Sequence, residues 1–174
     1  GTYPAQLAFK ELSYRACDRI NNAITRAANQ EQEGRITAML DPYTPTGSTR
    51  FVNFKTTKPG YETRPDLCPV NYAVIDSGWE GEFARIVEKH PKTLRYVKNQ
   101  ALGFEVPYLA AGNQRKYTPD FIVLLDDGHG PDDPLQLIVE VKGYRNEDVK
   151  DKSTTMREYW VPGVNALKAY GRWA

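Results

Sequence analysis

Three ionisable residues border apolar segments in the second half of the chain: Asp120, Glu140 and Lys142. Asp120 comes directly before the apolar run 121–125, and Glu140 follows the apolar run 135–139, with Lys142 two positions later. Charges at the ends of buried strands need a partner, because removing an unpaired charge from water is costly. Two carboxylates favour a hard divalent cation such as Mg²⁺, and a nearby lysine could orient a water molecule bound to it. These residue types therefore predict metal-assisted hydrolysis.

The pairing of the two apolar runs decides whether these residues meet. The segment 126–133 between the runs is rich in Asp, Gly and Pro, so the runs are predicted to form a β-hairpin. A hairpin centred in this turn places Asp120 opposite Glu140 and Ile122 opposite Ile138. Because side chains alternate along a strand, all three ionisable residues should project from one face.

A purely structural alternative exists for the same residues. Asp120 and Lys142 could form a cross-strand ion pair, with Glu140 at a frayed strand end. That interpretation accounts for two of the three charges and leaves the third unexplained. We therefore favour a metal site with Asp120 and Glu140 as ligands.

The segment before these strands predicts a helix over residues 78–90, with Ser77 as its N-cap. Its apolar stripe should consist of Trp79, Phe83, Ile86 and Val87. Glu80 borders this stripe and is expected to face inward. Glu82 has Arg85 within helical reach on its own side, which is typical of a solvated ion pair.

An inward Glu80 could add a third carboxylate to the site, and Glu82 is the reserve candidate. The alternative for Glu80 is an ordinary glutamate in the first helical turn, where the helix dipole favours a negative charge. The two interpretations of Glu80 stay open at this point.

The remaining pattern predicts an α/β fold with a mixed sheet of about five strands flanked by helices. Further strands are expected near residues 50–56, 72–77, 94–99 and 104–110, and further helices near 5–28 and 147–156. The segment Asp41–Ser48 is rich in turn-forming residues. We therefore predict an N-terminal helical extension over residues 1–46 and a second domain over residues 47–174.

Composition restricts the function classes only weakly. The net charge of +1 gives no overall preference for nucleic acid, but Lys98, Arg115 and Lys116 lie near the predicted site in sequence and are candidates for phosphate contacts. An ordinary solvated surface is the alternative for each of them. Two Cys and two His residues show no zinc-site spacing. With no signal-peptide pattern and no apolar run of membrane-spanning length, a cytoplasmic protein with reduced thiols and no membrane partner is expected.

The order Pro119-Asp120, nineteen intervening residues, then Glu140-x-Lys142 resembles the PD-(D/E)xK nuclease superfamily. More closely, the chain from about residue 34 onward resembles the C-terminal endonuclease domain of the restriction subunit of type III restriction enzymes. The blocks that carry this resemblance are residues 47–58, 68–71, 76–80, 96–99, 102–108, 117–121, 140–143 and 170–173.

The resemblance implies a restriction-endonuclease-like fold and a type III site-specific deoxyribonuclease that cuts double-stranded DNA with Mg²⁺. Asp120 and Glu140 would hold the metal, with the Val141 carbonyl as a further ligand. Lys142 would stand beside the attacking water, and Glu80 would be the acidic residue from the preceding helix.

The resemblance also implies partners. These are a helicase-like ATPase motor in the same parent chain and a modification (methyltransferase) subunit. The chain contains no Gly-x-x-x-x-Gly-Lys-Ser/Thr phosphate loop, so the motor is expected elsewhere in the parent protein. The alternatives are a non-catalytic DNA-binding or docking module that keeps the nuclease fold, and a DNA repair nuclease.

Overall fold

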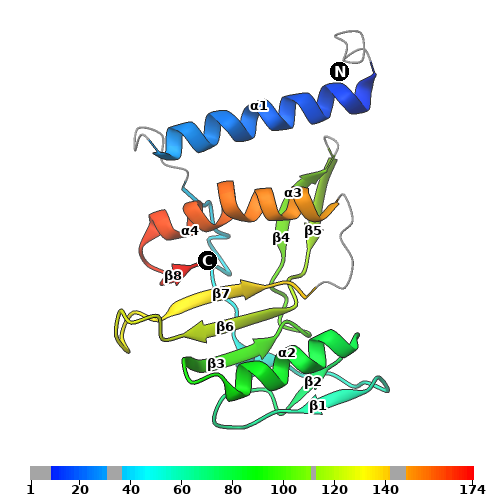
Figure 1. Ribbon diagram of the computed structural model, residues 1–174, viewed down its shortest axis with the longest axis vertical. Helices are drawn as coiled ribbons and strands as arrows, with labels where there is room; N and C mark the ends of the chain where they lie inside the picture. The colour runs from blue at the N-terminus through cyan, green and yellow to red at the C-terminus, as the bar shows by residue number, and fades with distance from the viewer. Residues whose placement is uncertain (1–8, 31–36, 111–112, 142–147) are drawn as a thin grey trace. The chain divides into compact units, whose positions relative to one another are not determined.

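The computed structural model describes residues 9–30, 37–110, 113–141 and 148–174 and shows a mixed α/β protein (Figure 1). The chain forms two compact units, each built from separated segments. One comprises residues 1–38, 106–117 and 146–167, and the other comprises residues 39–105, 118–145 and 168–174. The domain boundary expected after residue 46 stays a prediction. Within the described ranges, no helix combines the length and the apolar character needed to cross a membrane.

The first unit combines helices with a β-hairpin. Its elements are α1 (Lys10–Gln30), β4 (Val106–Ala110), β5 (Asn113–Tyr117), α3 (Asp148–Thr155), the π-helical turn η3 (Met156–Trp160) and α4 (Val161–Leu167). Strands β4 and β5 pair antiparallel, with Val106 opposite Tyr117. The ammonium of Lys152 on α3 lies 5.2 Å from the Tyr117 ring centre and 5.8 Å from that of Tyr108, so cation–π attraction links α3 to the hairpin. The helices predicted near 5–28 and 147–156 are confirmed for the described residues.

The second unit is built on a four-stranded sheet in the order β3-β6-β7-β8. Its strands are β3 (Thr93–Lys98), β6 (Phe121–Leu125), β7 (Leu135–Val139) and β8 (Arg172–Trp173). The sheet is mixed, because β3, β6 and β7 pair antiparallel while β8 runs parallel to β7. The unit also contains η2 (Thr49–Phe51), β1 (Gly60–Glu62), β2 (Tyr72–Val74) and α2 (Gly78–Lys89), and β1 pairs antiparallel with β2.

The register predicted for the hairpin of β6 and β7 is confirmed. Ile122 lies opposite Ile138 and Phe121 lies opposite Val139. The two apolar runs and the turn rich in Asp and Gly between them were therefore sufficient to predict which residues face each other.

Helix α2 covers one face of this sheet (Figure 1). Ala84 and Val87 on α2 pack with Phe121 and Val123 of β6 in one buried cluster. The stripe predicted on α2 is wrong in part, because Trp79 and Ile86 are largely exposed, at 67% and 55%. Ala84 is fully buried in the cluster instead.

The strand predicted near residues 50–56 is also wrong. Residues 49–51 form the short 3₁₀ turn η2, and residues 52–56 belong to no strand. An alternating pattern yields a strand only where a neighbouring strand accepts and donates its backbone hydrogen bonds. This segment alternates between intermediate and exposed side chains, and among the described residues no strand pairs with it.

Strand β8 is tied to the turn between β6 and β7 by Arg172. Its guanidinium donates to both oxygens of Asp127, at 2.9 Å and 2.7 Å, and to the Asp133 carboxylate at 2.8 Å. It also donates to the Asp133 carbonyl at 2.6 Å. The hydrogen bonds from Arg172 lower the pKa of the Asp127 carboxyl below its usual range.

Replacing Arg172 by methionine is expected to lower the midpoint of urea denaturation at pH 7, because β8 loses its link to the turn. Since the pKa of Asp127 is lowered by folding, this stabilisation is present above the unfolded-state pKa of about 4 and is lost as the pH falls. The difference in urea midpoint between R172M and the unmodified protein should therefore become smaller below about pH 4. Tryptophan fluorescence in urea at a series of pH values measures it. R50M, at an exposed arginine, is the control, and a difference that does not change with pH would contradict the ion-pair account.

Candidate active site

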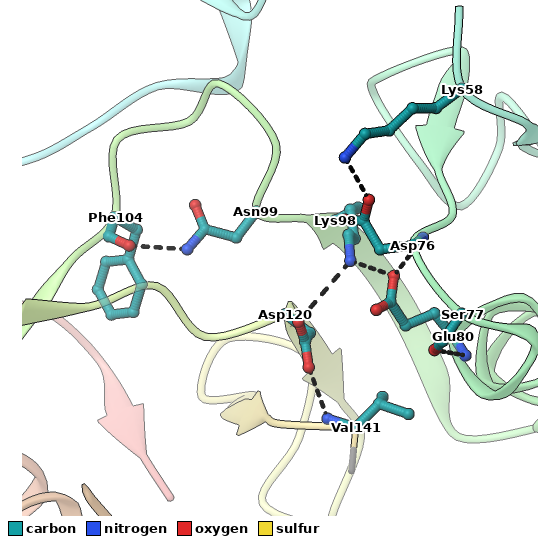
Figure 2. A network of polar contacts seen from close by, with 9 residues as sticks. All are labelled: Lys58, Asp76, Ser77, Glu80, Lys98, Asn99, Phe104, Asp120 and Val141. Atoms are coloured by element: carbon teal, nitrogen blue, oxygen red, sulfur yellow. Dashed lines mark hydrogen bonds and ion pairs between the residues drawn. The ribbon is translucent and has the colours of Figure 1, made fainter. Parts of the chain in front are cut away.

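Three of the predicted site residues, Glu80, Lys98 and Asp120, lie close together at one end of the four-stranded sheet, with Val141 beside Asp120 (Figure 2). Lys98 ends β3, Asp120 lies in the bend before β6, and Glu140 comes one residue after β7. Because Phe121 lies opposite Val139, Asp120 and Glu140 stand one position further along the same pair of strands. Glu80 reaches this end of the sheet from the first turn of α2.

Lys98 lies among the carboxylates. Its side chain is only 7% exposed, and its Nζ lies 2.5 Å from Glu80 Oε2 and 3.8 Å from Asp120 Oδ1. The ammonium also lies 5.1 Å from the centre of the Phe121 ring. A buried ammonium needs such partners, because it has lost its hydration shell. Lys98 therefore belongs, as a cation, to a cluster with the carboxylates Glu80, Asp120 and Glu140, which we call the carboxylate cluster.

Asp120 is held by the main chain of the neighbouring strand. Its Oδ2 accepts a hydrogen bond from the Val141 N–H at 2.7 Å (Figure 2). Burial raises the pKa of the Asp120 carboxyl, and the negative charges of Glu140 and Glu80 raise it further. The Val141 hydrogen bond and the charge of Lys98 lower it only in part. Burial and the two neighbouring carboxylates therefore disfavour the ionised form of Asp120 more than the Val141 N–H and Lys98 favour it.

The first turn of α2 fixes the position of Glu80. Ser77 caps the helix by accepting a hydrogen bond from the Glu80 N–H at 3.4 Å, and Glu80 Oε2 accepts from the Asp76 N–H at 3.1 Å. Asp76 in turn forms an ion pair with Lys58, at 2.6 Å. This reciprocal cap confirms the predicted helix start and aims the Glu80 carboxylate at the end of the sheet.

The predicted difference between the two glutamates of α2 is confirmed. Glu80 is buried, whereas Glu82 is exposed and pairs with Arg85 at 3.3 Å. Of the two glutamates, Glu80 is the one that contacts Lys98 and whose charge raises the pKa of Asp120. Its role in chemistry stays a prediction.

The other predicted site residues lie as follows. Lys142 is outside the described residues, and Val141 is described through its N–H, which donates to Asp120. Arg115 and Lys116 lie on β5 of the first unit, where both are exposed. Lys98, predicted as a phosphate contact, lies instead inside the carboxylate cluster.

Two contributions to the site escaped the sequence reasoning. The first is Lys98, a charged residue that directly follows the apolar residues Tyr96 and Val97 at the end of a strand. Asp120 was recognised from the same kind of position next to an apolar run, so the place of Lys98 could have been predicted in the same way. The pair of Lys58 and Asp76 has no local signal, because the two residues are separated in the sequence and come together only through the fold.

The carboxylate oxygens of Asp120 and Glu140 are of the ligand type that a hard cation such as Mg²⁺ prefers. Among the residues that the structure describes, no three His, Cys, Asp or Glu side chains gather as a metal-binding group. Asp120 and Glu140 are nevertheless carboxylates at neighbouring positions, and the charge of Glu140 adds to the effect of burial in raising the pKa of Asp120. Carboxylate oxygens with excess negative charge are what Mg²⁺ selects in proteins. The residues fit a two-carboxylate Mg²⁺ site completed by main-chain or water oxygens.

Comparison of the chain with protein-family models, with curated proteins and with solved structures gave no match. The functional argument therefore depends on the residues of the site and on their geometry.

Proposed function

We propose that this chain is a Mg²⁺-dependent endonuclease that hydrolyses phosphodiester bonds in double-stranded DNA, as the nuclease domain of a type III restriction enzyme. The observation that carries the proposal is the meeting of Glu80, Asp120 and Glu140, which are far apart in the sequence, at one end of a sheet. Single charged residues at strand ends are common on solvated surfaces. The pKa of Asp120 is raised by burial and by the charges of Glu140 and Glu80, and a buried Lys98 lies beside it; such an arrangement is costly to maintain and points to a function.

The finer fold assignment, a restriction-endonuclease-like arrangement, is part of the same proposal. It is supported by the succession of α2, β3, β6 and β7: α2 contains Glu80, β3 ends at Lys98, Asp120 directly precedes β6 and Glu140 directly follows β7. The antiparallel pairing of β6 with β3 and β7 brings the ends of these strands together.

The proposed mechanism gives each residue a physical role. Asp120 and Glu140 would hold Mg²⁺, with the Val141 carbonyl as a further oxygen. The bound ion supplies Lewis-acid stabilisation of the scissile phosphate and lowers the pKa of a water molecule. The Val141 N–H keeps the Asp120 carboxylate in a fixed orientation, at 2.7 Å. Lys142 would orient the attacking water and offset negative charge in the transition state.

The proposed partners follow from the same assignment. Arg115 and Lys116 are exposed on β5 and suit contacts to the phosphates of double-stranded DNA. A helicase-like ATPase motor in the parent chain, a separate methyltransferase subunit and a cytoplasmic location complete the proposal. Lys98 is assigned to the carboxylate cluster instead of the DNA surface, because its ammonium is buried between acids.

The proposal is tested by incubating the chain, in excess over DNA, with supercoiled plasmid in the presence of Mg²⁺ or of EDTA. We expect nicked and linear products with Mg²⁺ and none with EDTA, because the carboxylates need the ion to act on a phosphate. Agarose gel electrophoresis of a time course measures the products. Cleavage that persists in EDTA, or no product with either Mg²⁺ or Mn²⁺, would overturn the assignment.

One observation favours the second candidate, a non-catalytic DNA-binding module. Lys98 already neutralises part of the cluster, and the described residues hold no group of three metal-ligating side chains. Such a module would shift DNA in a gel equally well with and without Mg²⁺. It would also show no Mn²⁺ binding that depends on Asp120 and Glu140, which separates it from the nuclease.

A further inference from the structure

We propose that Lys98 is an internal counterion of the acidic site, which holds Glu80 and Asp120 together in the metal-free protein and competes with the metal ion for Asp120. The inference rests on the proposed Mg²⁺-dependent function and adds a positioning residue to it. It also assigns Glu80 a role, as the carboxylate that retains Lys98 when the ion binds.

The first step of the argument is the confinement of Lys98. The side chain is 7% exposed and extends from the end of β3, with its ammonium near the Phe121 ring and two carboxylates. Strand β3 is fixed by its pairing with β6, where Lys98 lies opposite Phe121. The ammonium is therefore delivered to the cluster by the fold, and reaching solvent would require it to give up both ionic partners.

The second step concerns charge. Lys98 lies between Glu80 and Asp120, and Glu140 directly follows the strand that pairs with β6, so one positive charge offsets the mutual repulsion of these carboxylates only in part. A divalent cation held by Asp120 and Glu140 would relieve this repulsion. It would also place two further positive charges near an ammonium that now lies 3.8 Å from Asp120 Oδ1. Like charges at such separations in a site of low polarity repel strongly. The metal ion and the Lys98 ammonium therefore compete for the Asp120 carboxylate.

The third step is the asymmetry of the two contacts. Lys98 Nζ lies 2.5 Å from Glu80 Oε2 but 3.8 Å from Asp120 Oδ1. Glu80 is itself held in place by the Asp76 N–H and by the cap at Ser77. Lys98 can thus give up Asp120 and keep Glu80. In this arrangement Glu80 acts through Lys98 and is not a metal ligand.

Mn²⁺ binding to a set of variants tests this inference by isothermal titration calorimetry, a readout independent of DNA cleavage. Lys98→Met keeps the length of the side chain and removes the charge, and should lower the dissociation constant for Mn²⁺ about tenfold. Glu80→Gln should weaken Mn²⁺ binding, because the Lys98 ammonium loses its closest carboxylate and then pairs more strongly with Asp120. Adding Glu80→Gln to Lys98→Met should change binding little, since no ammonium remains to be retained. Lys92→Met, at an exposed lysine, removes the same charge away from the cluster and should leave binding unchanged.

The outcomes separate the inference from the proposed function. If the unmodified chain binds no Mn²⁺ in a manner that depends on Asp120, the metal site itself is wrong and the inference falls with it. If the unmodified chain binds Mn²⁺ and Lys98→Met binds it equally or less tightly, only the competing role of Lys98 is overturned. If the double variant binds much more weakly than Lys98→Met, Glu80 is a metal ligand and its assigned role is wrong.

The double variant also covers the case in which Lys98→Met alone does not fold. It lacks both the ammonium and its closest carboxylate, so less uncompensated charge is buried. The test is then the comparison with Glu80→Gln: the double variant should bind Mn²⁺ more tightly. Equal or weaker binding would contradict competition by Lys98.

Discussion

Replacing Asp120 by asparagine is expected to reduce Mg²⁺-dependent DNA cleavage by about a thousandfold or more, equivalent to about 4 kcal/mol of lost transition-state stabilisation. Asparagine removes the negative charge that would hold the ion and keeps one acceptor oxygen for the Val141 N–H. The loss should therefore arise from chemistry and not from a change in the strand ends. Initial rates of plasmid nicking with enzyme in excess measure the effect.

The folded structure should tolerate this change. The pKa of Asp120 is raised mainly by burial, which means that the fold favours the neutral form of this side chain. Asp120→Asn should accordingly keep the urea midpoint of the unmodified chain or raise it. Asp126→Asn, at the exposed far end of β6, is the matched control and should leave cleavage unchanged. A D120N variant that cleaves within tenfold of the unmodified rate would remove Asp120 from the site.

Replacing Glu88 by alanine should have the largest effect on stability, a loss of about 3–5 kcal/mol in the free energy of unfolding. Glu88 lies on α2, and its carboxylate accepts hydrogen bonds from the Tyr61 hydroxyl at 2.6 Å, the Tyr96 hydroxyl at 2.7 Å and the Arg64 N–H at 2.8 Å. Three donors lose their partner at once, and Tyr96 is 2% exposed, so water does not readily replace the carboxylate.

Urea denaturation followed by far-ultraviolet circular dichroism measures this loss. Glu82→Ala on the same helix is the control, because Glu82 is exposed in an i,i+3 pair and should change stability by no more than about 0.5 kcal/mol. Equal midpoints for E88A and E82A would show that the network around Glu88 contributes little. The position of α2, and with it that of Glu80, would then need another explanation.

Local signals explain which parts of the structure were predictable. Ser77 and Glu80 formed a helix start that the structure confirms, and the turn between β6 and β7 set a register that placed Ile122 opposite Ile138. The inward position of Glu80 followed from its neighbours on the helix. Each of these inferences needed only residues within one element or one hairpin.

The errors concern contacts between distant segments. The segment 50–56 has strand-like alternation, but no strand within the described part of the chain pairs with it. Strand β5 (Asn113–Tyr117) was missed because its polar residues pair with β4 in a small sheet of two strands. The ion pair of Lys58 and Asp76 likewise joins two residues that are distant in the sequence. Sequence periodicity reports the environment of one element, whereas these features depend on which elements become neighbours.

The packing of the first helix is a further limit. The structure contains the helix predicted near residues 5–28, but the apolar residues Leu12, Ile20 and Ile24 are exposed in it. An apolar stripe defines a face that favours burial. It does not identify the surface that covers that face.

The central claim is that Asp120 and Glu140 hold one divalent ion, and the most direct test is a crystal of the chain soaked in Mn²⁺ and measured for anomalous scattering. We expect one strong anomalous peak about 2.2 Å from a carboxylate oxygen of Asp120 and from one of Glu140, with the ammonium of Lys98 nearer to Glu80 than to the ion. The same soak of D120N should lack the peak. A peak elsewhere, or carboxylates of Asp120 and Glu140 that point to opposite sides of the sheet, would contradict the account.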